Sequence, residues 1–196
     1  PQKIGEKWAL VTPKIMEMVY QPNINDWQVP LVHSRRESHG VFKDRELERP
    51  VKQKVITQRY TNESINFIRR SVRENKPFFV YLAHSMPHVP LFRSTDFEGK
   101  SRAGIYGDVI EEIDWSVESI LKEIKDLEID DNTYVVFTSD NGPWLLYREH
   151  AGSAKPLRNG KATTFEGGMR VMTVFTGPEI RPGITKELGM QTDLFV

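Results

Sequence analysis

The sequence contains no cysteine, no excess of charge of either sign and no long apolar run. Without cysteine, the chain cannot form a disulfide, a thiolate metal site or a cysteine nucleophile. Lys+Arg and Asp+Glu each total 27, so no net field attracts nucleic acid, and we expect none as a partner. No stretch approaches the ~18 apolar residues of a transmembrane helix, so we expect no membrane segment. What remains is a 196-residue chain, 38% hydrophobic, large enough for a core.

Two segments have the apolar spacing of amphipathic helices. Ile65, Ile68 and Val72 stand at i, i+3 and i+7, which predicts a helix over residues 57–74. The stretch "GIYGDVIEEIDWSVESILKEIKDL", 104–127, places its apolar residues on one face and is the stronger of the two signals.

Three short apolar runs, 77–83, 134–139 and 169–175, are typical of buried strands. A strand, a helix and a further strand in this order favour parallel pairing in an α/β sheet covered on both faces. Residues 1–55 have scattered prolines and charges and little periodicity, so we interpret them as irregular and loop-rich, with one or two short strands. The regular part of the domain is then 56–196.

Polar residues follow each predicted strand, where ligands of α/β sheets usually bind. After the first strand, Pro87 and Pro90 flank His88 and restrict the backbone of its turn. An imidazole held in this way can donate a hydrogen bond to an anion or transfer a proton. The alternative is a histidine that only caps a loop carbonyl.

Asp140 and Asn141 directly follow the second strand. A carboxylate and an amide oxygen are ligand types preferred by Ca²⁺ or Mg²⁺, although such ions need further ligands. An Asx-turn that ends the strand is the structural alternative.

Lys161 follows Gly160 in the third loop, a pairing that suits an anion because the glycine lets an oxyanion approach the backbone. The loop is not a phosphate-binding Walker loop, since Lys155 and Ala162 stand where that motif needs Gly and Ser or Thr. A solvated surface lysine is the alternative. Four carboxylates on the second helix are attributed mainly to a solvated face: Asp108, Glu111, Glu112 and Asp114.

Four stretches together closely resemble the type I sulfatases, the group of arylsulfatase A and galactosamine-6-sulfatase: "PFFVYLAHSMPHVPL", "YGDVIEEIDWSVESIL", "NTYVVFTSDNGPW" and "LRNGKATTFEGGMRV". The resemblance implies an alkaline-phosphatase-like fold with a mostly parallel sheet flanked by helices, and hydrolysis of sulfate monoesters. It further implies that Asp140 and Asn141 bind Ca²⁺, sometimes assigned as Mg²⁺, and that His88 and Lys161 contact the sulfate. Loop 144–156 would then help to select the substrate, with His150 as a candidate contact.

The chain departs from the family pattern in two places. It has no C/S-x-P-S-R motif, whose Cys or Ser becomes the formylglycine nucleophile, and residues 1–55 lack the family's adjacent aspartates. We therefore expect a partial catalytic domain, with formylglycine and further metal carboxylates in a missing N-terminal part. An incomplete site should bind metal poorly and show little turnover. An incomplete sheet would also leave apolar faces uncovered, which predicts poor solubility or association of the chain alone.

Two alternatives stay open beside a sulfatase fragment. One is a phosphatase or phosphodiesterase of the same superfamily, and the other is a degenerate sulfatase that acts as a binding module. The expected partner is a sulfated small molecule or glycan. The resemblance favours a secreted, periplasmic or lysosomal protein, while the sequence does not define the compartment or the oligomeric state.

Overall fold

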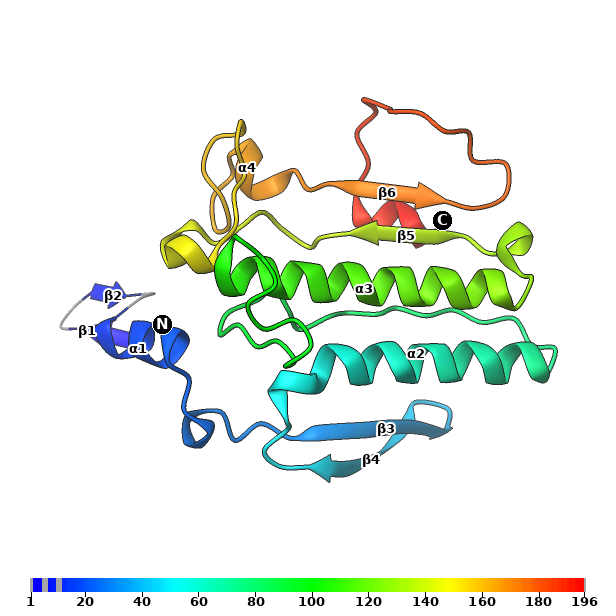
Figure 1. The fold of residues 1–196 in the computed structure, drawn as a ribbon, viewed down its shortest axis with the longest axis horizontal. Coiled ribbons are helices and arrows are strands. Elements are labelled where there is room, and N and C mark those ends of the chain that lie inside the picture. The colour runs from blue at the N-terminus through cyan, green and yellow to red at the C-terminus, as the bar shows by residue number, and fades with distance from the viewer. Residues whose placement is uncertain (1, 5–6, 10–11, 196) are drawn as a thin grey trace.

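The computed structural model describes residues 2–4, 7–9 and 12–195, and Figure 1 shows how the elements are arranged. Two long helices lie side by side, α2 (Ile56–Arg73) and α3 (Gly104–Asp126). In this view two small sheets flank the helix pair: β3 (Leu31–Ser38) with β4 (Val41–Glu48) beside α2, and β5 (Val135–Thr138) with β6 (Thr173–Thr176) beside α3. Helices with small sheets place this part of the chain in the α/β class.

Both expected long helices are confirmed, each within one residue of its predicted bounds. Polar contacts join them, because Thr61 and Ser116 share a hydroxyl hydrogen bond of 2.6 Å. Farther along, the Arg69 guanidinium donates two hydrogen bonds, of 2.7 and 2.6 Å, to the carboxylate of Glu123. No helix within the described ranges is both long and apolar enough to cross a membrane.

The parallel pairing predicted for 77–83 and 134–139 is not confirmed among the strands that the structure describes. β5 and β6 pair antiparallel, with Val136 opposite Phe175, and the expected strand at 77–83 has no strand pairing among the described residues. Apolar runs indicate burial, but they do not encode the direction of the neighbouring strand, because both arrangements bury the same side chains.

The segment predicted as irregular, 1–55, contains more regular structure than expected. Its longest elements, β3 and β4, form an antiparallel hairpin closed at His39-Gly40, where Gly40 has a φ of +75°. Nearly every side chain of the hairpin is exposed, so neither strand needed an apolar alternation that the sequence could reveal. The other elements of this segment are β1 (Gln2–Ile4), β2 (Lys7–Ala9), α1 (Pro13–Tyr20), η1 (Ile24–Asp26) and η2 (Gln53–Val55).

The predicted division of the chain into residues 1–55 and 56–196 stays a prediction.

Short helical turns occur in the chain after α3. The turns after α3 are the 3-10 helices η3 (Asp130–Asn132), η4 (Leu145–His150) and η5 (Gln191–Phe195), and the single-turn α4 (Glu166–Met169).

Two buried apolar clusters lie close to the loops of interest. The first contains Met86 and Leu91, from the loop after 77–83, together with Val109 and Ile113 of α3. The second consists of Val19 of α1 with Tyr147 and Ala151, at and just after η4. The loop between α2 and α3 and the turn after β5 are therefore both anchored in packed cores.

Large apolar side chains are exposed on the β5–β6 ribbon and along 77–83. In β6, 57% of Val174 and 49% of Phe175 are exposed, and 76% of Tyr81 is exposed in the extended run. Such contiguous apolar surface is unusual for a monomer, so it supports the expectation of association, which stays a prediction.

Candidate active site

His88 lies exposed on the loop that connects the two long helices. Its Nδ1 lies 2.7 Å from the carbonyl oxygen of Val89. Because a carbonyl only accepts, Nδ1 carries the proton in this contact, and Nε2 makes no hydrogen bond to the described residues. The ring thus caps a loop carbonyl with one nitrogen and keeps the other available for a ligand.

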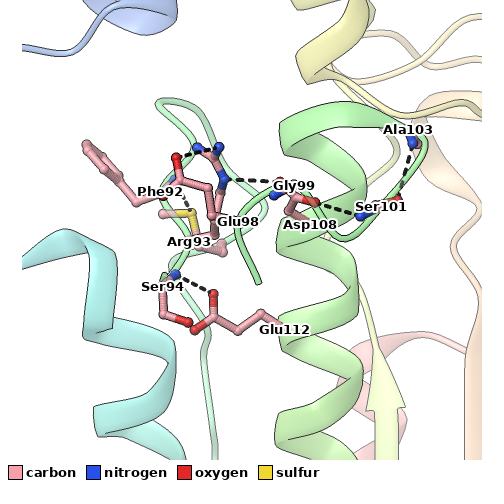
Figure 2. Close-up of polar contacts among 10 residues, drawn as sticks. Phe92, Arg93, Ser94, Glu98, Gly99, Ser101, Ala103, Asp108 and Glu112 are labelled. Atoms are coloured by element: carbon pink, nitrogen blue, oxygen red, sulfur yellow. Dashed lines mark hydrogen bonds and ion pairs between the residues drawn. The ribbon is translucent and has the colours of Figure 1, made fainter. Parts of the chain in front are cut away.

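The far half of the same loop is held by Asp108 of α3, as Figure 2 shows. This carboxylate accepts hydrogen bonds from the backbone amides of Gly99 and Ser101, at 2.9 and 2.8 Å, and from Nε of Arg93 at 3.1 Å. Burial opposes its ionisation, but the two amides and the guanidinium outweigh that effect and hold the pKa of Asp108 below its ordinary value. The loop that presents His88 is therefore tied to a helix by a buried, ionised group.

Glu112 forms a second tie one turn along α3. Its carboxylate accepts a hydrogen bond of 2.9 Å from the backbone amide of Ser94, and only 1% of the residue is exposed. Burial raises the pKa of Glu112. The expectation of a solvated face is therefore wrong for Asp108 and Glu112, whereas Glu111 and Asp114 are exposed as expected.

Asp140 and Asn141 follow β5 after Ser139, and Asp140 is exposed. The side-chain nitrogen Nδ2 of Asn141 donates to the carbonyl oxygen of Gly142 at 3.0 Å, so the side-chain oxygen Oδ1 of Asn141 stays available for a ligand. Two hard oxygen ligands fit Ca²⁺ or Mg²⁺ chemically, but such ions take six or more. No group of three or more acidic, histidine or cysteine side chains able to hold a metal occurs in the described part of the chain. These residues alone form at most part of a metal centre.

Gly142, in the turn after β5, and Gly167 and Gly168, in the stretch before β6, let these two segments approach backbone to backbone. The amide of Gly142 donates to the carbonyl of Gly168 at 3.0 Å, and the amide of Lys161 donates to the carbonyl of Pro143 at 2.8 Å. A Cβ added to Gly142 would lie 1.8 Å from the carbonyl oxygen of Gly167, a distance no side chain tolerates. Glycine is required here for close approach, and the result places Lys161 beside the turn that follows Asn141.

Trp144 brings His88 and Lys161 to the same place. The His88 ring lies 5.8 Å from the Trp144 ring between centroids, at an interplanar angle of 61°. The Lys161 ammonium nitrogen lies 5.3 Å from the centroid of the same indole. Trp144 was not itself a predicted site residue, although it begins the loop 144–156 that was expected to help select the substrate.

His150 is not part of this group. It is buried at the end of η4, where its ring stacks on Tyr20 with centroids 4.3 Å apart, and its Nδ1 has no hydrogen-bond partner in the described structure. Burial lowers the pKa of His150, and Glu149 partly offsets this effect. The structure thus shows a packed ring at the position where the sequence predicted a substrate contact.

Comparison with known proteins gives a family for this arrangement. The family described as Sulfatase matches residues 9–196. The N-acetylgalactosamine-6-sulfatases of Canis lupus familiaris and Homo sapiens are each 43% identical over 143 residues, which cover 71% of this chain and 27% of theirs. Steryl-sulfatase of Homo sapiens is 37% identical over 139 residues, 68% of this chain and 24% of the relative. The chain thus spans about a quarter of the length of these relatives.

Solved structures agree with this result. The crystal structure of Ps i-CgsB in complex with k-i-k-neocarrahexaose matches with a TM-score of 0.59 and 30% identity, over 70% of this chain and 31% of that one. The PsFucS1 sulfatase from Pseudoalteromonas sp. matches with a TM-score of 0.59 and 27% identity, over 69% and 29%. From the family match and these relatives, the chain belongs to the sulfatase family.

Proposed function

We propose that this chain forms one side of the active site of an enzyme that hydrolyses sulfate monoesters. The observation that carries the proposal is that His88 and Lys161, from loops far apart in the sequence, both contact Trp144. One imidazole and one ammonium group thereby contact the same ring, three residues after Asn141. A small anion with an ester oxygen is the ligand that suits such a set.

Lys161 and His88 have distinct roles in this proposal. The Lys161 ammonium offsets the negative charge of the sulfate oxygens as the S–O bond breaks, the kind of electrostatic stabilisation that often dominates catalysis. In its imidazolium form, with Nδ1–H still on the Val89 carbonyl, His88 donates a hydrogen bond from Nε2 to the sulfate or to the ester oxygen and can pass that proton to the leaving group. Its Nδ1 stays on the Val89 carbonyl and fixes the direction of the ring.

Asp140 and Asn141 supply two oxygen ligands of a divalent cation in this proposal, Ca²⁺ or Mg²⁺. When bound, such an ion neutralises charge on the sulfate. The remaining ligands, and the formylglycine nucleophile, come from residues outside these 196, since no C/S-x-P-S-R sequence is present. The loops described here therefore bind and orient the sulfate, and they do not attack it.

A sulfated glycan is the proposed substrate class. One relative is named for 6-sulfated N-acetylgalactosamine, and the structure of Ps i-CgsB contains k-i-k-neocarrahexaose. Both names refer to saccharides, and both proteins share with this chain most of its length. An oligosaccharide also suits an open arrangement in which His88 and Asp140 are exposed.

The test uses the whole protein that contains this sequence. Its kcat/KM is measured for 4-nitrophenyl sulfate and 4-nitrophenyl phosphate, with Ca²⁺ present and after removal of the ion by a chelator. The proposal predicts faster hydrolysis of the sulfate, and a rate that chelation lowers and Ca²⁺ restores. Preferential hydrolysis of the phosphate would support the phosphatase alternative, and turnover of neither would support a degenerate binding module.

A further inference from the structure

Trp144 joins the two groups that the proposed function assigns to the sulfate. The imidazole of His88 lies against the indole in a tilted, edge-like geometry at 5.8 Å, and the Lys161 ammonium lies 5.3 Å from its centroid. Both distances are within the range of attractive aromatic and cation–π contacts. A single ring therefore contacts both the imidazole and the ammonium.

The packed core fixes the position of this ring. Trp144 meets the ring of Tyr147 edge-on, with centroids 4.9 Å apart and an interplanar angle of 84°. It packs on the buried cluster of Val19, Tyr147 and Ala151, in which only 2% of Tyr147 is exposed. The hydroxyl of Tyr20 donates to the Tyr147 carbonyl at 2.7 Å and holds that turn from the other side. The indole is thus a rigid support and not a mobile surface group.

An aromatic partner leaves the charge of Lys161 available. No carboxylate in the described part of the chain forms an ion pair with Lys161. A carboxylate at this position would neutralise the ammonium and repel a sulfate. The indole attracts the cation through its quadrupole and adds no net charge, so the ammonium is oriented and still able to attract an anion.

The backbone reinforces the same placement. The amide of Lys161 donates to the carbonyl of Pro143, the residue before Trp144, at 2.8 Å. A Cβ on Gly160 would lie 2.2 Å from that carbonyl oxygen, so glycine is needed for the two segments to come together. Lys161 is therefore tethered to residues 143–144 by its backbone and by its side chain.

We propose that Trp144 is a positioning residue of the sulfate site, which holds the His88 imidazole and the Lys161 ammonium on one support without neutralising either. This inference rests on the proposed function, because it gives a purpose to the two groups named there. Trp144 acts through His88 and Lys161, the two groups that the proposed function assigns to the sulfate.

The test measures binding of inorganic sulfate, at constant ionic strength, to the whole protein that contains this sequence. Amide shifts of residues 159–161 report the titration for the wild type and for Trp144→Phe and Trp144→Leu. We expect Kd to rise about two- to fivefold in the leucine variant and less in the phenylalanine variant, because phenylalanine keeps a weaker quadrupole. Trp115→Leu is the matched control, since Trp115 contacts Phe97 instead, and its Kd should equal that of the wild type.

A double-mutant cycle separates positioning from general packing. In a Lys161→Gln background the ring has only the His88 imidazole left to hold, so we expect Trp144→Leu to cause a smaller further loss of sulfate binding than it does in the wild type. Equal losses in both backgrounds would contradict the inference. The Lys161 ε-methylene protons provide a direct signature, since a ring current should shift them upfield in the wild type and in Trp144→Phe but not in Trp144→Leu.

The outcomes distinguish this inference from the function on which it rests. A wild type that binds sulfate, with a Trp144→Leu variant that binds it equally tightly, contradicts the positioning role alone. A wild type that binds no sulfate, although the Lys161 protons show the ring current, contradicts the proposed sulfate site and with it the role of Trp144. Graded weakening together with loss of the ring-current shift supports both.

Discussion

The guanidinium of Arg93 donates a hydrogen bond to the buried carboxylate of Asp108 over 3.1 Å, and this contact ties the loop that carries His88 to helix α3. The same carboxylate accepts two backbone amides of that loop. The shape of the loop between α2 and α3 therefore depends on Asp108, a side chain of α3 that is not part of the loop.

Replacing Asp108 by asparagine should destabilise the fold. The asparagine side chain keeps one acceptor oxygen, but it loses the negative charge that Arg93 faces. Its NH₂ group would also direct a donor at backbone amides, which are donors themselves. Breaking a buried, charged network typically costs about 2–4 kcal/mol of unfolding free energy. Urea denaturation measures the change. The exposed Asp114→Asn on the same helix is the control and should alter stability by less than about 0.5 kcal/mol; equal effects would contradict the role of the network.

The stability of the fold should decrease as the pH falls from about 6.5. Burial lowers the pKa of His84 and of His150, while an unfolded imidazole titrates near 6.5. Between the folded and unfolded pKa values the unfolded chain binds more protons, so this contribution is complete above about pH 6.5 and is lost below it. Urea midpoints at pH 7.5 and 5.5 should differ in the wild type, and less so in a His84→Gln, His150→Gln double variant.

The exposed His39 in the β3–β4 turn provides the control for this pH dependence. A His39→Gln variant should keep the full difference between the two midpoints. If the double variant retains the same dependence as the wild type, the buried histidines are not its source.

Substitution of Gly142 by alanine should disrupt the contact between the two loops. Its Cβ would overlap the Gly167 carbonyl, and relief of that overlap requires the hydrogen bond from Gly142 to Gly168 to lengthen. Overpacking of this kind costs about 1–3 kcal/mol, and we expect sulfate binding to weaken with it. Thermal unfolding and a sulfate titration measure both effects. Gly183→Ala, where no atom lies within 4 Å of the added Cβ, should change neither.

The isolated chain should associate through the β5–β6 ribbon. Met172 and Val174 are 72% and 57% exposed, and side chains two residues apart in an extended chain share a face. Lysine at both positions should reduce association, which sedimentation velocity measures, because charged residues on strands oppose edge and face pairing. Ile184→Lys, in the exposed C-terminal segment, should have no effect. A monodisperse wild-type monomer would contradict this prediction.

The sequence was sufficient to predict the long helices, because their apolar residues recur with a period that only a helix buries on one side. It was not sufficient to predict the direction of β5 against β6, since a continuous apolar run carries no such information. The β3–β4 hairpin was missed for a related reason: with both faces exposed, its side chains show no alternation.

The site was predictable in part. His88, Asp140 and Asn141, which follow apolar runs, and Lys161, which follows Gly160, indicated chemistry, and the structure brings His88 and Lys161 to one ring. The burial of Asp108 was not predictable, because a carboxylate on a helix is normally solvated and only tertiary contacts with a distant loop reverse that expectation. Trp144 gave no local signal either, since its role depends on two residues far from it in the chain.

The most direct test of the central claim is the kcat/KM for 4-nitrophenyl sulfate, with Ca²⁺, of the whole protein that contains this sequence and of its His88→Ala and Lys161→Ala variants. Lys186→Ala, an exposed lysine outside the loops of the site, and His39→Ala serve as matched controls. The account predicts a loss of about 100-fold or more in each of the two site variants and wild-type activity in the controls. Site variants that hydrolyse the sulfate as fast as the wild type would contradict it.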